Sequence, residues 1–154
     1  MPANAFDLFM GQHPPVGALV GTANSVLWDE SALNPVVKER MRIALAEELG
    51  CSYCTRFRTD VGGEPVLGAA DGLGQDDQRK AALAESFARA VVAGDAGDEA
   101  TVAMQEEFTP EEFTDLVFSM GWFIGMQHVG RLMHWDDSCP VAPIRRLVEA
   151  GEAA

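Results

Sequence analysis

Apolar residues recur at three- and four-residue spacing along most of the chain, which predicts helices, and no stretch alternates convincingly as a strand would. One apolar run follows Pro14-Pro15, which can start a helix. A second follows Asn34-Pro35, where asparagine can cap a helix and proline suits its first position. This second run ends at Gly50, a residue type that commonly stops helices. We therefore expect two amphipathic helices in the first third of the chain.

The next part of the chain is richer in glycine. Residues 61–75 are expected to form a loop that holds one helical turn at most. Asp76 and Asp77 can cap the helix that follows, and glycines break that helix at residues 94–97. A further short helix is expected over residues 99–107.

The clearest start signal precedes the last long helix. Thr109 can cap this helix, Pro110 suits its first position, and Glu112 completes a capping box. The helix is expected to run to about His134 with apolar residues on more than one face, which is typical of a helix in a core or a subunit interface. These apolar residues are Phe113, Leu116, Val117, Phe118, Met120, Trp122, Ile124 and Met126. A last short helix is expected in the tail beyond Ser138.

Length and charge narrow the class of protein. A chain of 154 residues fits one domain with a single core, which we place over residues 1–154. The formal net charge of −13 argues against nucleic acid and anionic membranes as partners, because both attract a surplus of Lys and Arg. Residues 1–7 lack the features of a secretory signal, and the most apolar stretch, 116–126, is too short to cross a bilayer. We expect a cytoplasmic protein.

Two of the three cysteines, Cys51 and Cys54, form a Cys-x-x-Cys motif directly after Gly50. A short helix is expected to begin near Cys51 and to end before Gly62. The unpaired N–H groups and the dipole of a helix N-terminus favour a thiolate, and the spacing permits a disulfide in the first turn. In the cytosol such a pair is more often catalytic or metal-binding than structural.

Other readings of the cysteines stay open. Cys51 and Cys54 could be buried thiols without a reaction, or they could bind zinc together with His128, His134 or Cys139. Cys139 otherwise reads as an incidental thiol in the tail.

The surroundings of the motif carry a family resemblance. Eleven residues separate Glu39 from Cys51, and three residues separate Cys54 from Arg58. A Glu, eleven residues, Cys-x-x-Cys, three residues and a His is the pattern of the alkylhydroperoxidase D / carboxymuconolactone decarboxylase superfamily, which the chain resembles over about residues 13–133.

This resemblance implies a compact all-helical bundle that assembles as a homo-oligomer, a trimer or a hexamer. It implies an antioxidant alkyl hydroperoxide reductase-like enzyme, a thiol-dependent peroxidase or disulfide reductase without a metal or an organic cofactor. Cys54 would attack the peroxide or disulfide, Cys51 would resolve the product into a disulfide, and Glu39 would belong to the proton relay. A lipoyl-type or thioredoxin-type protein would return the electrons, and a peroxiredoxin is a further candidate partner.

The chain departs from the family at two positions. Arg58 stands where the family has its relay His, and Tyr53 stands where alkylhydroperoxidase D has another His. Arginine does not release a proton at neutral pH, so we expect Arg58 to pair with Glu39 and to stabilise a thiolate by charge alone. Tyr53 is a candidate substrate-binding residue or a packing residue. His128 could replace the missing relay base, although a histidine there is more often a core residue.

Two other functions remain as alternatives. A lactone decarboxylase or isomerase belongs to the same superfamily, but that branch does not depend on a Cys-x-x-Cys pair. A helical oligomer with a decayed redox site is the non-enzymatic alternative.

Overall fold

A computed structural model describes residues 5–61, 64–66 and 73–133, and these residues are mostly helical. The helices are α1 (Ala5–Gly11), α2 (Pro14–Asp29), α3 (Pro35–Glu48), α4 (Ser52–Arg56), α5 (Gln75–Ala93), α6 (Asp98–Glu107) and α7 (Pro110–Leu132). Two strands of two residues each, β1 (Asp60–Val61) and β2 (Glu64–Pro65), pair antiparallel. The predicted all-helical class is confirmed, with this short hairpin as the exception.

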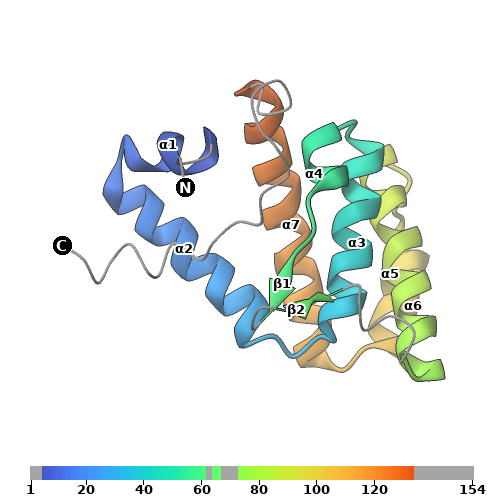
Figure 1. Ribbon diagram of the computed structural model, residues 1–154. Helices are drawn as coiled ribbons and strands as arrows, with labels where there is room; N and C mark the ends of the chain where they lie inside the picture. Colours follow the sequence, from blue (N-terminus) through green and yellow to red (C-terminus); the bar gives the residue numbers. More distant parts are fainter. Residues whose placement is uncertain (1–4, 62–63, 67–72, 134–154) are drawn as a thin grey trace.

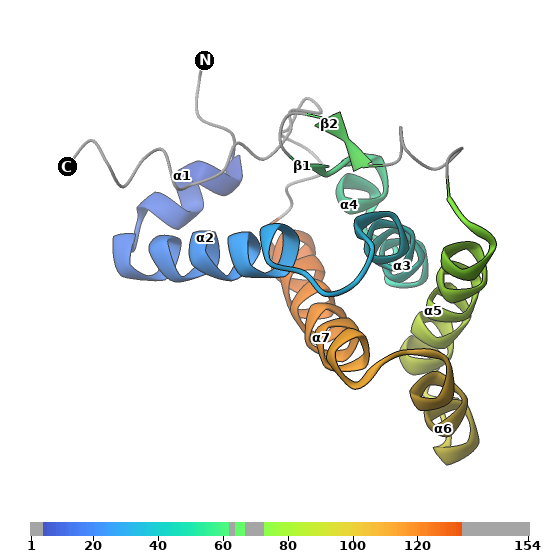
Figure 2. The ribbon, with the colours of Figure 1, turned by 90° about the horizontal axis from the view of Figure 1, so that it is seen from below.

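Helix α3 lies at the centre of the molecule. It packs along α5 and α7 and carries α4 at its end (Figure 1). Helix α6 contacts α5 and α7. Helices α1 and α2 lie on the far side of α7 from α5 and α6, as both Figure 1 and Figure 2 show. The chain therefore consists of a helical body, α3 to α7, and an arm, α1 and α2.

The main core forms where one face of α3 meets α5 and α7. Val37, Met41 and Leu45 recur every four residues on that face and are completely buried. Their partners include small residues on α5, which permit a close approach, and larger apolar residues on α7. These partners are Ala81, Ala84, Phe87, Ala88, Leu116, Met120 and Phe123.

The local signals for two helix starts and one helix end are confirmed. The Asn34 side chain accepts a hydrogen bond from the Val36 amide at the start of α3 (2.9 Å). Thr109 and Glu112 form the reciprocal capping box of α7. After α3, Gly50 has a φ of 66°, a left-handed conformation that favours glycine.

Helix α5 begins slightly earlier than the sequence predicts. Gly74 is its N-cap, so Asp76 and Asp77 lie in the first turn instead of capping it. Carboxylates in a first turn are favourable because they face the positive end of the helix dipole. Asp77 also accepts a hydrogen bond from the Asn34 side chain (2.8 Å), which ties the start of α5 to the start of α3. Helix α1 was not predicted.

A buried ion pair joins α3 to α7. The Lys38 ammonium is fully buried and donates to Asp115 (2.6 Å), to the Ser31 hydroxyl (2.8 Å) and to the Leu27 carbonyl. Burial, the largest effect, lowers the pKa of Lys38 although the hydrogen bond and charge of Asp115 act to raise it. Burial also raises the pKa of Asp115, but the hydrogen bonds from Lys38 and Ser31 outweigh it and leave that pKa below its usual value. Burial therefore opposes the charge of Lys38, and the contact with Asp115 favours it.

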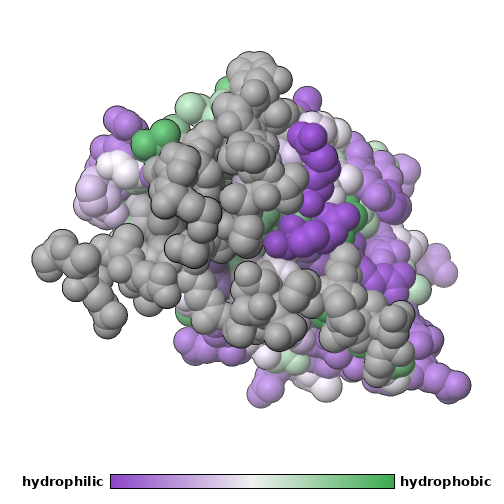
Figure 3. Space-filling view, in the orientation of Figure 1, coloured by the Kyte–Doolittle hydropathy of each residue, from purple (hydrophilic) through white to green (hydrophobic). Residues whose placement is uncertain are grey.

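The outer surface of α7 stays apolar in part. Phe118 is 74% exposed and Val117 is 45% exposed, while the opposite side of the helix is buried in the core. Hydrophilic side chains gather elsewhere, over the side of the molecule that holds α5 and α6 (Figure 3). Assembly through α7 stays a prediction.

Among the described residues, no helix combines the length and the apolar character needed to cross a membrane. The predicted tail helix lies outside the described residues, as do His134 and Cys139.

Candidate functional site around Cys51 and Cys54

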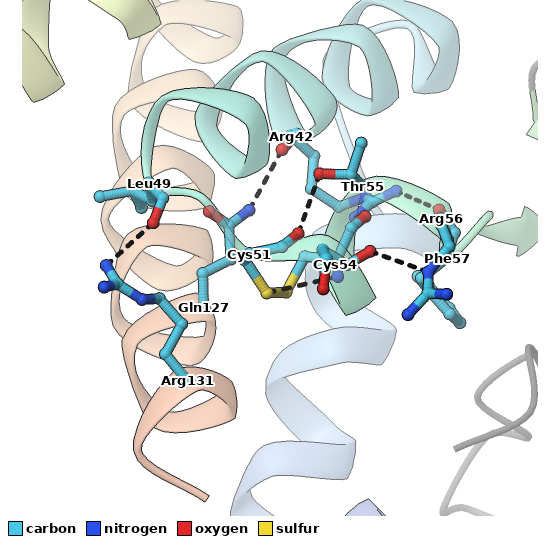
Figure 4. Close-up of a disulfide and its surroundings, with 10 residues drawn as sticks. Arg42, Leu49, Cys51, Cys54, Thr55, Arg56, Phe57, Gln127 and Arg131 are labelled. Atoms are coloured by element: carbon cyan, nitrogen blue, oxygen red, sulfur yellow. Dashed lines mark hydrogen bonds between the residues drawn. A yellow bond between two sulfur atoms is a disulfide. The ribbon is translucent and has the colours of Figure 1, made fainter. Parts of the chain in front are cut away.

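Cys51 and Cys54 form a disulfide at the N-terminus of α4, with their Cα atoms 5.3 Å apart (Figure 4). Gly50 turns the chain out of α3, and the Cys51 amide then donates to the Ala46 carbonyl (2.9 Å). Cys51 is the N-cap of α4, and its sulfur accepts a hydrogen bond from the Cys54 amide (3.3 Å). The predicted position of the motif, at the start of a helix that follows Gly50, is confirmed.

The two sulfur-bearing residues differ in their access to a pocket. Cys51 is 1% exposed and does not line the pocket, whereas Cys54 is 9% exposed and lines it. The pocket has a volume of about 90 Å³, enough for several water molecules or a small organic group. A molecule in this pocket therefore meets Cys54 and not Cys51.

Half of the residues in the pocket wall are aromatic, and the wall comes from both the arm and the body of the molecule. Helices α1 and α2 contribute three residues and α7 contributes four, while α3, α4 and the segment after α4 supply the remainder. The lining residues are Phe6, Asn24, Trp28, Arg42, Tyr53, Cys54, Phe57, Thr59, Trp122, Phe123, Met126 and Gln127. The indole of Trp122 donates to the Asn24 side chain (3.0 Å), which fixes part of the arm against α7.

Glu39 lies beneath the site and is completely buried. Arg42, one turn along α3, donates from Nε to Oε2 (2.7 Å) and from Nη2 to Oε1 (2.9 Å). Thr59 donates its amide to Oε1 (3.1 Å) and its hydroxyl to Oε2 (2.9 Å). Each oxygen of the Glu39 carboxylate thus accepts two hydrogen bonds, which compensates for its burial.

Arg42 also ties α3 to the segment that carries the cysteines. Its Nη1 donates to the Cys54 carbonyl (2.8 Å) and its Nη2 donates to the Phe57 carbonyl (2.7 Å). The guanidinium lies over the Phe57 ring, 5.3 Å from its centroid. Arg42 was missed by the sequence analysis, although its position three residues after Glu39 on a helix is a signal for an ion pair.

The expected pair of Glu39 with Arg58 is wrong. Arg58 is exposed and donates to the carbonyls of Thr55 (2.5 Å) and Phe57 (2.9 Å). Arg42 takes its place because its Nε and Nη2 groups both reach Glu39 from the next turn of the same helix. Glu39 is therefore a buried carboxylate at the site and does not lie on the surface of α3.

Tyr53 lines the pocket and also stacks on Phe57, with the ring centroids 6.1 Å apart. Its position is therefore compatible with a role in substrate binding and with a role in packing. His128 is exposed on α7 and does not line the pocket. Within the described ranges, no group of three Asp, Glu, His or Cys residues is arranged to hold a metal ion.

Gln127 is a further polar residue at the site that the sequence did not suggest. It is buried, and its Nε2 donates to the Arg42 carbonyl (3.1 Å), while Arg131 donates to the Leu49 carbonyl (2.9 Å) (Figure 4). Gln127 thus reaches from α7 to the middle of α3 and Arg131 reaches its C-cap, so α7 helps to hold the segment that leads into Cys51. The Gln127 Oε1 atom is buried without a hydrogen-bond partner among the described residues.

In comparisons with protein-family models, with curated proteins and with solved structures, the chain finds no match.

Proposed function

We propose that the protein is a thiol–disulfide enzyme, a peroxidase or disulfide reductase that cycles Cys51 and Cys54 between dithiol and disulfide. The observation that carries this proposal is the disulfide at a helix N-terminus in which Cys54 alone lines a pocket. A pocket of about 90 Å³ in which half of the lining residues are aromatic suits a small apolar group next to the sulfur. The family resemblance of the sequence points to the same chemistry.

In the proposed peroxidase reaction, the reduced Cys54 thiolate attacks the terminal oxygen of a hydroperoxide. The O–O bond breaks, Cys54 becomes a sulfenic acid, and the departing alkoxide takes a proton from solvent to become an alcohol. The Cys51 thiol then attacks the sulfenic sulfur, which forms the disulfide and releases water. Its burial beside Cys54 suits Cys51 to this second step and not to the first.

With a disulfide substrate, the Cys54 thiolate would form a mixed disulfide and expel one thiolate of the substrate. Cys51 would then attack the Cys54 sulfur and release the second thiolate. In both reactions the oxidised protein would be returned to the dithiol by a lipoyl-type or thioredoxin-type donor. Homo-oligomeric assembly, as a trimer or hexamer, is part of the proposal, since α7 exposes Phe118 and Val117.

The experiment is a single-turnover reaction of the reduced protein with tert-butyl hydroperoxide or a small disulfide. All variants carry Cys139→Ser, so that only the motif can react. We expect loss of two thiols per chain and a Cys51–Cys54 disulfide in peptide maps. Cys51→Ser should instead accumulate a sulfenic acid on Cys54 that dimedone traps, and Cys54→Ser should not react.

The outcome that contradicts the proposal is a reduced protein that reacts with neither substrate faster than free cysteine does. That result would favour the lactone enzyme or the non-enzymatic oligomer.

A further inference from the structure

Among the described residues that line the pocket, Arg42 alone carries a permanent charge. Of the lining residues, only Arg42, Tyr53 and Cys54 carry ionisable side chains. Glu39, which holds Arg42, does not line the pocket. The positive member of this ion pair therefore faces the space that Cys54 faces, and the negative member lies behind it.

One N–H group of the Arg42 guanidinium makes no hydrogen bond to the described residues. An arginine has five N–H groups. The hydrogen bonds to described residues use one on Nε, one on Nη1 and two on Nη2, which is four in total. The remaining N–H belongs to Nη1, the nitrogen that already donates to the carbonyl of Cys54. An unused donor thus lies on the nitrogen that contacts the backbone of the reactive residue.

We propose that Arg42 is the catalytic cation of the site, which stabilises the Cys54 thiolate and donates its remaining Nη1 hydrogen to the departing oxygen of the hydroperoxide. This inference rests on the proposed function. A nearby positive charge favours the ionised form of a thiol, and a preorganised donor lowers the energy of a developing oxyanion. Arg42 keeps its own proton throughout, because a guanidinium does not act as an acid at neutral pH.

In this arrangement Glu39 acts as a positioning residue. Its two oxygens fix the Nε and Nη2 edge of Arg42, so that Nη1 stays directed toward Cys54. The carboxylate also opposes part of the positive charge that the thiolate feels. Arg58, which the sequence suggested for the same task, is exposed and donates to backbone carbonyls instead.

The test is the pH dependence of the reaction of Cys54 with methyl methanethiosulfonate, in a Cys51→Ser, Cys139→Ser background. This reagent reports the thiolate directly and requires no turnover. We expect Arg42→Gln to raise the midpoint by about one pH unit or more, and Arg42→Lys, which keeps the charge, to raise it by less than half of that. Arg58→Gln is the matched control and should leave the midpoint unchanged.

Two further variants guard against loss of the fold. Glu39→Gln removes the opposing charge while its amide oxygen can still accept from Arg42, so the midpoint should move downward, which checks that the titration senses the charges of this ion pair. The double variant Glu39→Gln, Arg42→Gln avoids a buried unpaired carboxylate, and its midpoint should lie above that of the parent. Far-ultraviolet circular dichroism checks that each variant is folded.

The inference is overturned if both Arg42→Gln and the double variant keep the parent midpoint, or if Arg58→Gln shifts it. With Cys51 present, Arg42→Gln should also slow the reaction with tert-butyl hydroperoxide at pH 7 by about tenfold or more. Failure of the proposed function gives a different result. The reduced wild-type protein would then not react with the hydroperoxide or the disulfide, while the pH midpoint of the reaction of Cys54 with methyl methanethiosulfonate could still be measured.

Discussion

Replacing Asp115 by Asn should destabilise the fold strongly, because it leaves the buried Lys38 ammonium without its anionic partner. Lys38 is completely buried, and Asp115 is one of three acceptors that contact its Nζ. The two acceptors that remain, the Leu27 carbonyl and the Ser31 hydroxyl, are neutral. A charge in this position must either stay poorly compensated or lose its proton.

The magnitude follows from burial. Breaking a buried pair by removing one partner costs about 3–5 kcal/mol, and the 12% exposure of the Asp115 side chain places this case near the lower end, about 3 kcal/mol. Adding Lys38→Met to Asp115→Asn removes the stranded charge and should restore about 2 kcal/mol of the free energy of unfolding. Met preserves the unbranched shape of the lysine stem.

The assay is urea denaturation followed by circular dichroism, with the disulfide kept oxidised in every variant. The matched control is Arg89→Ala, which breaks a half-exposed ion pair with Glu47 and Glu48 and should cost less than about 1 kcal/mol. If Asp115→Asn costs no more than this control, or if Lys38→Met restores nothing, then Lys38 is hydrated and the reasoning is wrong.

Further tests concern the pH dependence of stability, the N-terminal cap of α7, the left-handed residue Gly50 and the assembly of the protein. The pKa of Lys38 is lower in the fold than its ordinary value of 10.5. Between the lowered pKa and about 10.5 the unfolded chain therefore binds more protons than the folded protein, so the free energy of unfolding should rise with pH in this window. Urea titrations at several pH values should show this rise for the wild type relative to Lys38→Met. Thr109→Ala removes half of the capping box of α7 and should cost about 1 kcal/mol in thermal denaturation, whereas an unchanged melting curve would contradict the capping role. Gly50→Ala introduces strain at a φ of 66° and should cost about 1 kcal/mol in urea denaturation, more than Gly121→Ala, which lies within a helix with open space around it. Phe118→Asp should reduce the mass measured by light scattering if α7 forms the oligomer interface, while an unchanged mass would exclude that face.

The helices could be predicted because their signals are local. The Asn34 cap, the Thr109 capping box and the left-handed Gly50 depend on only a few neighbouring residues, and the structure has all three where the sequence places them. The same holds for the cysteine motif, since its position at the start of α4 follows from Gly50. Helix α1 has no comparable start signal and a short sequence, so it was not predicted.

The partners within the site could not be predicted in the same way. Helical spacing places Arg42 within reach of Glu39, whereas the pairing with Arg58 was expected from the family pattern, and only the path of the chain after α4 decides between them. The contact between Trp122 and Asn24 joins residues 98 positions apart, and no local pattern indicates it. The pocket wall depends on such distant contacts, so the sequence identified the reactive cysteines but not the wall around Cys54.

The division of the pocket between the arm and the body has a consequence for how the protein could diversify. The reactive residue and the ion pair below it lie in α3 and α4, whereas Phe6, Asn24 and Trp28 belong to the arm. Substitutions in the arm can therefore reshape the space next to Cys54 while leaving the contacts of Glu39 and Arg42 intact. Selection for a new small molecule could act on one part of the chain while the reactivity of the thiol is inherited unchanged from the other.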